Sequence, residues 1–577
     1  MTTNVNTGVP RAPRVSRGKS VAWVLAACMT GSPGADMARA AGDTAAPGSC
    51  GADGTAFTGA VPAPEALEAQ GARIGRVDIV VEDIFDPTNP AERAAPYRLA
   101  NKLHINTRED AVRSQLLFGE SEPYSQQKIE ETERLLRGRR YVFDAHIAAS
   151  CYHQDEQTVD VYVRVRDVWS LNPGFSFSRK GGENGTGFEL EDQDFMGRGE
   201  LASLGWKSDV DRTSLRLVYE DPQLLGTWWR GRVSYADNSD GSMSDLGVAR
   251  PFYSLDTRWS AGTGLQFGDR RMSRYREGHV LDEFDESVNR FEISGGRSRG
   301  LQDGWTRRWL AGVRYDASEF TESPDSELVA ALPADRELVY PWFGLEWIED
   351  DFDTAHNRDQ IGRTEDVQYG AALRADVGLA SSALGSDRTA ALFGLNASTG
   401  HRFGDRDSLF FGSTLTGRWE AAGLRDAALL GEARYYHRER ESALFYAAAR
   451  ANAVAEPDLD HQLLLGGDNG LRGYPLRYQS GTASVLLTAE QRFFTNWFPL
   501  RLYHIGAAVF ADAGRTWGED VAGKAPLGWL ADAGVGLRIG NSRSGLGNVL
   551  HVDLAVPLNR QPGIDSMQLV IETRHSF

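Results

Sequence analysis

The sequence predicts a mainly β protein, in which a small α+β domain precedes a transmembrane antiparallel β-barrel of sixteen strands. Three observations support this prediction. The chain begins with the layout of an export signal, and residues 72–169 mix helical and strand periodicities. From Ser170 to Phe577 the helical period is absent, and short segments alternate apolar and polar residues instead.

The composition excludes two classes of protein. A net charge of −18 over 577 residues argues against nucleic-acid binding, which requires clustered Lys and Arg for contact with phosphates. No run of eighteen consecutive apolar residues occurs, which excludes a membrane protein built from helices. A membrane barrel is compatible with this composition, because its strands present apolar residues only at alternate positions.

Residues 1–40 predict a signal peptide. The first 35 residues contain no Asp or Glu, and positively charged residues precede the apolar run VAWVLAACM. Cleavage after Ala40 fits the small-residue pattern at positions 38–40. The alternative is lipoprotein processing, in which Cys28 becomes a lipidated N-terminus.

Residues 41–71 are rich in Ala, Gly, Pro and Ser and predict a linker, with a short helix at PEALEAQ. After removal of the signal peptide, Cys50 and Cys151 are the cysteines left in the chain. Whether these two pair or remain as thiols is left open by the sequence.

Residues 72–169 predict one domain with the element order β-α-α-β-β, a sheet covered on one side by two helices. Thr107 and Asp110 are expected to begin the first helix as a capping box, while Ser125 caps the second helix and Gly138 ends it. In the last strand, valines at alternate positions share one face: Val159, Val161, Val163 and Val165.

Residues 170–577 are predicted to form the barrel. At roughly 25 residues per strand and turn, this length gives about sixteen strands. The alternating segments outnumber this estimate, and an odd number would leave the C-terminus on the wrong side of the membrane, so we expect some of them to be false. The sheet must close, because each unsatisfied backbone group at an open edge in the membrane costs several kcal/mol.

The final segment, MQLVIETRHSF, alternates most clearly. Met567, Leu569, Ile571 and Phe577 lie on one face of this strand, and its polar residues lie on the other. A terminal aromatic suits the girdle of aromatic residues at a membrane interface. Before it, residues 466–481 (GGDNGLRGYPLRYQSG) are too long and too rich in glycine for a hairpin turn.

These features resemble the Omp85 superfamily of outer-membrane barrels, from about residue 72 to Phe577. Residues 118–147 resemble part of a POTRA domain, the periplasmic module of that family. Leu471, Arg472, Gly473 and Tyr474 resemble the signature of its inward-folded loop, L6. Signatures of two later strands are matched by Phe510, Gly514, Gly534, Gly536 and Arg538.

The resemblance implies that L6 folds into the barrel lumen, where Arg472 pairs with acidic residues. Strand alternation independently places Phe510, Asp512 and Glu490 on inner faces. Glu490 and Asp512 are therefore the expected partners of Arg472, through charge-assisted hydrogen bonds worth about 1.5 to 3 kcal/mol. The alternative is an extracellular loop with a solvated arginine.

We expect no enzymatic activity, no metal and no cofactor. Residues 296–300 match the nucleophile-elbow pattern, but they lie among strands without the required strand-to-helix turn. The acidic run at residues 349–353 lacks the glycine and ligand periodicity of a calcium loop, and the histidines lack metal-ligand spacing.

The resemblance implies a protein of the bacterial outer membrane, with its POTRA-like domain in the periplasm, that inserts outer-membrane proteins or translocates polypeptides. The implied partners are the lipid bilayer, unfolded outer-membrane or secreted polypeptides, and periplasmic or lipoprotein accessory proteins. The expected mechanism is strand addition, at the sheet edge formed by residues 158–166 and at the seam between the first and last barrel strands.

Two alternatives stay open because the chain has room for one POTRA-like domain. The first is a pore of the two-partner secretion type, which passes a single secreted protein. The second is a structural surface-antigen barrel that transports nothing.

Overall fold

The computed structural model describes residues 61–545, 549–559 and 563–574. The predicted signal peptide, Cys28, Cys50 and Phe577 lie outside the described residues. Within the described part of the chain, no helix is both long and apolar enough to cross a membrane.

The N-terminal part, from residue 61 to Asp167, is an α+β domain. Its sheet has the order β1-β3-β2, in which β3 runs parallel to β1 and antiparallel to β2. Its strands and helices are β1 (Arg73–Glu82), β2 (Val142–His153), β3 (Thr158–Asp167), α1 (Pro64–Ala69), α2 (Ala95–Leu103), α3 (Glu109–Arg113), α4 (Gln126–Arg137) and the 3-10 helix η1 (Pro90–Glu92).

The core of this domain follows the predicted pattern. The four alternating valines of β3, Val159 to Val165, are fully buried beneath helical residues such as Ile129 and Leu136. Ser125 caps α4 as predicted, since its hydroxyl accepts a hydrogen bond from the Lys128 amide at 3.4 Å, and Gly138 ends the helix.

Three predictions about this domain are wrong. Three α-helices, α2, α3 and α4, lie between β1 and β2, where two were predicted. The segment predicted as an edge, residues 158–166, is the central strand of the sheet, because β3 pairs with β1 on one side and β2 on the other. Thr107 does not cap α3, whose N-cap is Arg108. The Thr107 side chain instead contacts Asp167 and Asp194, so a tertiary contact replaces the local cap.

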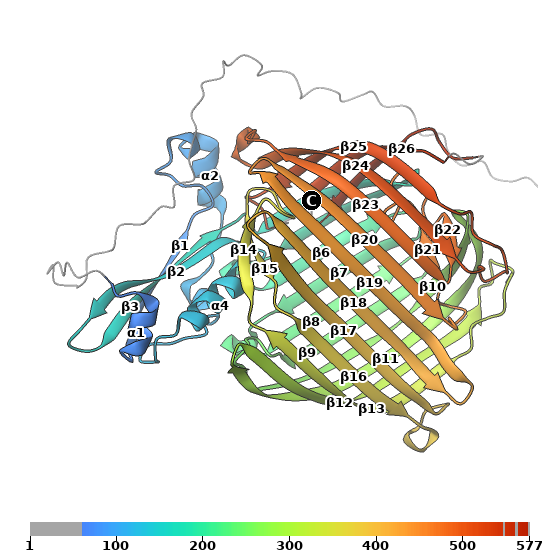
Figure 1. The fold of residues 1–577 in the computed structure, drawn as a ribbon, viewed down its shortest axis with the longest axis horizontal. Coiled ribbons are helices and arrows are strands. Elements are labelled where there is room, and N and C mark those ends of the chain that lie inside the picture. The colour runs from blue at the N-terminus through green and yellow to red at the C-terminus, as the bar shows by residue number, and fades with distance from the viewer. Residues whose placement is uncertain (1–60, 546–548, 560–562, 575–577) are drawn as a thin grey trace, which may run out of the picture. The chain divides into compact units, whose positions relative to one another are not determined.

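Most of the remaining strands close into one antiparallel barrel (Figure 1), which confirms the part of the predicted fold class that concerns a mainly β protein with a closed barrel. Its strands, in the order in which they pair around the barrel, are β4 (Leu171–Lys180), β5 (Glu183–Asp192), β6 (Leu201–Ser208), β7 (Thr213–Asp221), β8 (Arg230–Asn238), β9 (Gly241–Arg250), β10 (Trp259–Arg276), β11 (His279–Gln302), β12 (Trp305–Glu322), β13 (Arg336–Glu349), β16 (Ala372–Ala380), β17 (Ala390–Phe403), β18 (Asp407–Glu420), β19 (Gly423–Arg440), β20 (Ala443–Ala455), β23 (Ala483–Phe494), β24 (Tyr503–Trp517), β25 (Leu530–Asn541), β26 (Val549–Pro557) and β27 (Gln568–Arg574).

The barrel has 20 strands, so the predicted number of sixteen is wrong. Six strands, β4 to β9, occupy residues 171–250, and each strand with its turn takes about half of the roughly 25 residues assumed. The estimate was wrong because it assumed more residues per strand and turn than β4 to β9 use.

Two small sheets lie in the loops. β14 (Phe352–His356) pairs with β15 (Thr364–Gln368) between β13 and β16, and β21 (Leu463–Leu465) pairs with β22 (Gln479–Gly481) between β20 and β23. Short 3-10 helices occur in other turns: η2 (Phe195–Gly197), η3 (Leu224–Gly226), η4 (Ser382–Leu384) and η5 (Pro499–Arg501).

Candidate functional site in the barrel lumen

The glycine-rich loop between β20 and β23 is folded tightly onto itself. The amide of Gly467 donates to the carbonyl of Pro475 at 2.8 Å, and the amide of Leu471 donates to Gly466 at 3.0 Å. The latch, defined as Leu471–Tyr474, is buried: Leu471 and Tyr474 are fully inaccessible, and Arg472 is 3% exposed. A solvated extracellular arginine, the alternative considered from the sequence, does not describe this geometry.

The Arg472 guanidinium contacts three carboxylates on the barrel wall. Its Nε lies 2.7 Å from Asp512 Oδ2, and its Nη2 lies 3.2 Å from Asp512 Oδ1. Its Nη1 lies 3.1 Å from Glu490 Oε2 and 3.2 Å from Asp553 Oδ2. These contacts use all three nitrogens of the planar group, which a lysine ammonium cannot imitate.

The wall beneath Arg472 is built by strand alternation. Glu490 on β23, and Phe510 and Asp512 on β24, are buried at inward positions, as their neighbours along each strand alternate outward. The Arg472 guanidinium carbon lies over the Phe510 ring, 3.3 Å from the ring centre. The arginine is therefore held by stacking as well as by charge.

Asp553 is a part of this site that the sequence prediction missed. It lies on β26, where it is buried and binds Arg538 of β25 as well as Arg472. Arg538 Nη2 also lies 3.5 Å from Glu490 Oε2. The alternation of VLHVDLAV places Asp553 on the inner face, so the signal that revealed Asp512 was present in β26 too.

Two of the predicted glycines make room for this network. A Cβ on Gly534 would lie 2.2 Å from the Leu554 carbonyl oxygen and 2.4 Å from the Phe510 ring. A Cβ on Gly536 would overlap the Asp553 carboxylate and the Arg538 guanidinium. Any larger residue at either position would displace groups that hold or support Arg472.

The other predicted loop and strand residues anchor the latch at its ends. Leu471 and Tyr474 join a buried cluster with Leu465 and Leu530, and the Tyr474 hydroxyl donates to the Ala531 carbonyl at 2.9 Å. A Cβ on Gly473 would lie 2.7 Å from the Asp532 Cβ, and one on Gly514 would lie 2.9 Å from Leu465.

Arg492, a second residue that the sequence prediction missed, extends the network towards the other end of the barrel. It is 2% exposed on β23, with its Nε 3.3 Å from Glu490 Oε1. Its Nη1 donates to the Arg358 carbonyl at 2.8 Å and lies 3.4 Å from Asp359, both in the loop between β13 and β16. Glu490 is thus shared between Arg472 and Arg492.

The N-terminal domain meets the barrel at a buried pair of carboxylates. The Thr107 hydroxyl lies 2.8 Å from both Asp167 Oδ1 and Asp194 Oδ2. Burial raises the pKa of Asp194 to about 6, an effect that the Gly199 amide and the Thr107 hydroxyl only partly oppose. Asp194 is therefore a group that changes charge near neutral pH at this junction.

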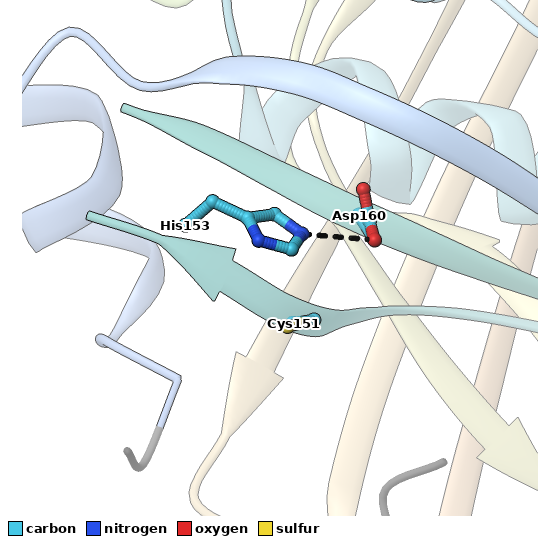
Figure 2. A group of neighbouring side chains, drawn as sticks. All are labelled: Cys151, His153 and Asp160. Atoms are coloured by element: carbon cyan, nitrogen blue, oxygen red, sulfur yellow. Dashed lines mark hydrogen bonds and ion pairs between the residues drawn. The ribbon is translucent and has the colours of Figure 1, made fainter. Parts of the chain in front are cut away.

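One group of three side chains in the described part of the chain has metal-ligand spacing: Cys151, His153 and Asp160, shown in Figure 2. Their donor atoms lie within 4.8 Å of one another. Cys151 is in a disulfide, and Asp160 already binds His153 at 3.1 Å and the Arg76 amide at 2.8 Å. The arrangement is therefore explained as a disulfide beside an ion pair, and its donor set does not suit a metal.

Several solved structures match this chain at low sequence identity. The crystal structure of BamA from Haemophilus ducreyi lacking POTRA domains 1-3 is 12% identical, with a TM-score of 0.37 over 87% of this chain and 85% of that chain. CdiB from Escherichia coli is 11% identical, with a TM-score of 0.47 over 88% and 77% of the two chains. CdiB from Acinetobacter baumannii is 11% identical, with a TM-score of 0.43 over 88% and 74%.

These three matches to this chain are distant in sequence. No protein-family model and no curated protein matches its sequence. The function of the barrel is therefore inferred from its own residues.

Proposed function

We propose that this chain is an Omp85-type factor of the bacterial outer membrane that inserts or translocates other polypeptides. The observation that supports this most is the latch itself: a loop folded into the lumen, with a buried arginine shared by three carboxylates from the strands β23, β24 and β26. Such a network fixes the relative positions of β23, β24 and β26, and β26 pairs with the last strand of the barrel, β27.

The seam between β27 and β4 is the place where the barrel would open. Among the described residues, one register pair, Ile571 with Arg179, joins these strands, whereas β4 and β5 share ten. Pro173 removes one backbone donor from β4, and Lys180 forms an ion pair with Glu572 across the seam. A seam with few backbone hydrogen bonds costs little to open, and its edges can pair with a client strand.

The N-terminal domain, which we propose is a POTRA domain in the periplasm, offers its own edges to clients. Since β3 is central, the edge strands are β1 and β2. Part of the β2 edge is occupied, because the Ile147 amide donates to Glu133 at 2.6 Å and Arg137 donates to the Ala145 carbonyl at 3.1 Å. The beginning of the β1 edge is occupied too, because the Ile74 amide donates to the Glu122 carbonyl and Arg113 donates to the Val77 carbonyl. We therefore propose that a client strand adds to β1 beyond Val77, or to β2 beyond Ala148.

The partners in this proposal are the outer-membrane bilayer, unfolded outer-membrane or secreted polypeptides, and periplasmic or lipoprotein accessory proteins. The large apolar residues exposed on the outside of the barrel support a position in lipid, and they include Phe175, Leu217, Leu246, Ile293 and Val377.

A pore for one secreted protein is the second candidate. The loop between β13 and β16, which enters the lumen beside Arg492, favours it, because a pore needs a closed resting state.

Depletion of the protein, followed by quantification of the outer-membrane and secreted proteins, tests these functions. An insertase predicts that many outer-membrane proteins fall together. Loss of one secreted protein alone would favour the pore, and unchanged levels of both classes would reject transport in favour of a structural barrel.

A cross-link tests the role of the seam. Arg179→Cys with Ile571→Cys places a disulfide between register partners, whose Cα separation in an antiparallel pair is within the range for a disulfide. We expect the oxidised form to stop client handling and the reduced form to restore it. Val552→Cys with Ile571→Cys makes the matched disulfide between β26 and β27, where the strands are already paired, and should have no effect.

A further inference from the structure

The loop between β13 and β16 forms a hairpin that enters the lumen. This mouth hairpin, residues 350–371, contains β14 and β15, which pair over five registers. Its tip is ordered by its own contacts: the Glu365 carboxylate accepts hydrogen bonds from the amides of Arg358, Asp359 and Gln360. The Gly362 amide donates to Asn357 Oδ1 at 2.7 Å.

The tip of the mouth hairpin is buried against the inner wall. Ile361 is 5% exposed and belongs to a cluster with inward residues of six barrel strands: Phe410, Tyr436, Leu444, Phe494, Ala508 and Val549. The guanidinium of Arg358 lies 4.2 Å from the Phe410 ring centre and 4.1 Å from that of Tyr436. Arg438 donates to the carbonyls of His356 and Asn357 at 2.9 and 2.7 Å.

The mouth hairpin is also held by the N-terminal domain, through residues of β14, of β15 and of the turn between them. Arg137 of α4 binds Asp366 with two hydrogen bonds, of 2.9 Å from Nε and 2.6 Å from Nη2. The Arg134 guanidinium lies 4.3 Å from the Phe352 ring centre, and Arg363 donates to the Val142 carbonyl of β2. Because α4 supplies two of these contacts, a movement of α4 relative to the barrel would displace the hairpin.

The hairpin also bounds the cavity beside the latch. A polar cavity of about 410 Å³ is lined by Asp359 of the hairpin, by Arg472 and Asp468 of the glycine-rich loop, and by Glu572 of the last strand. Barrels of this size enclose a lumen that wall side chains alone do not fill, and they need a plug to remain closed.

We propose that the mouth hairpin is a gate that closes the N-terminal-domain end of the lumen and leaves it when a polypeptide enters. That the cargo is a polypeptide rests on the proposed function. Closure of the lumen by the hairpin is a property of the barrel without a client. Arg492 is the positioning residue that connects the gate to the latch, because it binds both the hairpin and Glu490, which also holds Arg472. Displacement of the hairpin therefore changes the surroundings of Glu490.

The gate can be locked by one disulfide. A Cβ on Gly540 would lie 3.1 Å from the Ile361 Cβ, close to the separation found in disulfides. We expect purified Ile361→Cys, Gly540→Cys protein in planar lipid bilayers to show no openings when oxidised and wild-type openings when reduced. The two single-cysteine variants, and wild type with the same reductant, are the controls, because Cys151 is itself in a disulfide.

Removal of the gate should have the opposite effect. We expect replacement of residues 352–368 by a short Gly-Ser linker to raise the basal conductance severalfold. Asp359→Ala should raise the frequency of openings, because Asp359 contacts Arg492 and Tyr436, whereas Asp353→Ala, an exposed residue of the same hairpin, should not. An unchanged conductance after replacement, or equal openings of the oxidised and reduced double-cysteine protein, would overturn the gate.

These measurements separate the gate from the proposed function. Conductance is recorded without any client, so it reports closure of the lumen even where the barrel handles no polypeptide. The double-cysteine protein could lose its openings on oxidation while depletion leaves the outer-membrane and secreted proteins unchanged. This combination would support the gate and reject the transport function.

Discussion

The Arg472 guanidinium stacks on Phe510 at 3.3 Å while its Nε lies 2.7 Å from Asp512, the residue two positions further along the same strand. Two inward positions of β24 thus hold one arginine, Phe510 through the face of the guanidinium and Asp512 through its edge. This geometry depends on the planarity of the guanidinium as well as on its charge.

Arg472→Ala should therefore abolish client handling and lower the stability of the barrel by about 3 to 5 kcal/mol, because three buried carboxylates lose a shared partner. Arg472→Lys should recover little, since an ammonium cannot bridge three carboxylates and stack on a ring. The urea midpoint of the folded band on gels run without heating measures stability. Arg477→Ala, in the same loop but bound to Asp211 on its outer side, is the control and should have a smaller effect.

Gly534→Ala should destabilise the barrel, because its Cβ would meet the Leu554 carbonyl oxygen and the Phe510 ring at less than 2.5 Å. Overpacking of this kind costs about 1 to 3 kcal/mol or more. Gly412→Ala is the matched control, because this strand glycine has no atom within 4 Å of its added Cβ. Equal urea midpoints for the two variants would contradict the role assigned to Gly534.

Asp553→Ala should weaken the network of ion pairs around Arg472, to which Asp553 contributes from β26. The change deprives Arg472 and Arg538 of a buried carboxylate, and we expect a loss of about 3 kcal/mol in unfolding free energy. Asp245→Ala is the comparison, since Asp245 binds the neutral side chains of Ser234 and Gln266. A loss no larger than that of the comparison variant would show that Asp553 is dispensable to the latch.

The junction between the N-terminal domain and the barrel should weaken as the pH rises through about 6. The pKa of Asp194 is raised by burial, so the folded state binds a proton that the unfolded state has released, and this contribution is present at low pH and lost above pH 6. The shift from 3.8 to about 6 corresponds to about 2 to 3 kcal/mol.

Hydrogen-exchange protection factors of the Thr107 and Gly199 amides, corrected for the pH dependence of intrinsic exchange, measure this effect. Both amides donate to the Asp167 and Asp194 pair. Protection should be higher at pH 5 than at pH 8 in the wild type, and Asp194→Asn should remove the difference. A difference that persists in the variant would assign the pH dependence to another group.

Strand alternation predicted the inner wall correctly because the direction of a side chain in a strand depends only on its position along that strand. Glu490, Phe510 and Asp512 were placed in this way, and the same rule applied to β23 and β26 would have found Arg492 and Asp553. The number of strands was wrong because turns of very different lengths give the same local pattern.

The sequence alone determined that the chain is a closed antiparallel barrel behind an α+β domain, and which residues of its later strands face inward, because these properties follow from periodicity within each segment. The tertiary structure decided that β3 is central, that Thr107 binds Asp167 and Asp194, and that the mouth hairpin lies inside the lumen. Each of these depends on contacts between segments far apart in the chain, which local periodicity does not encode.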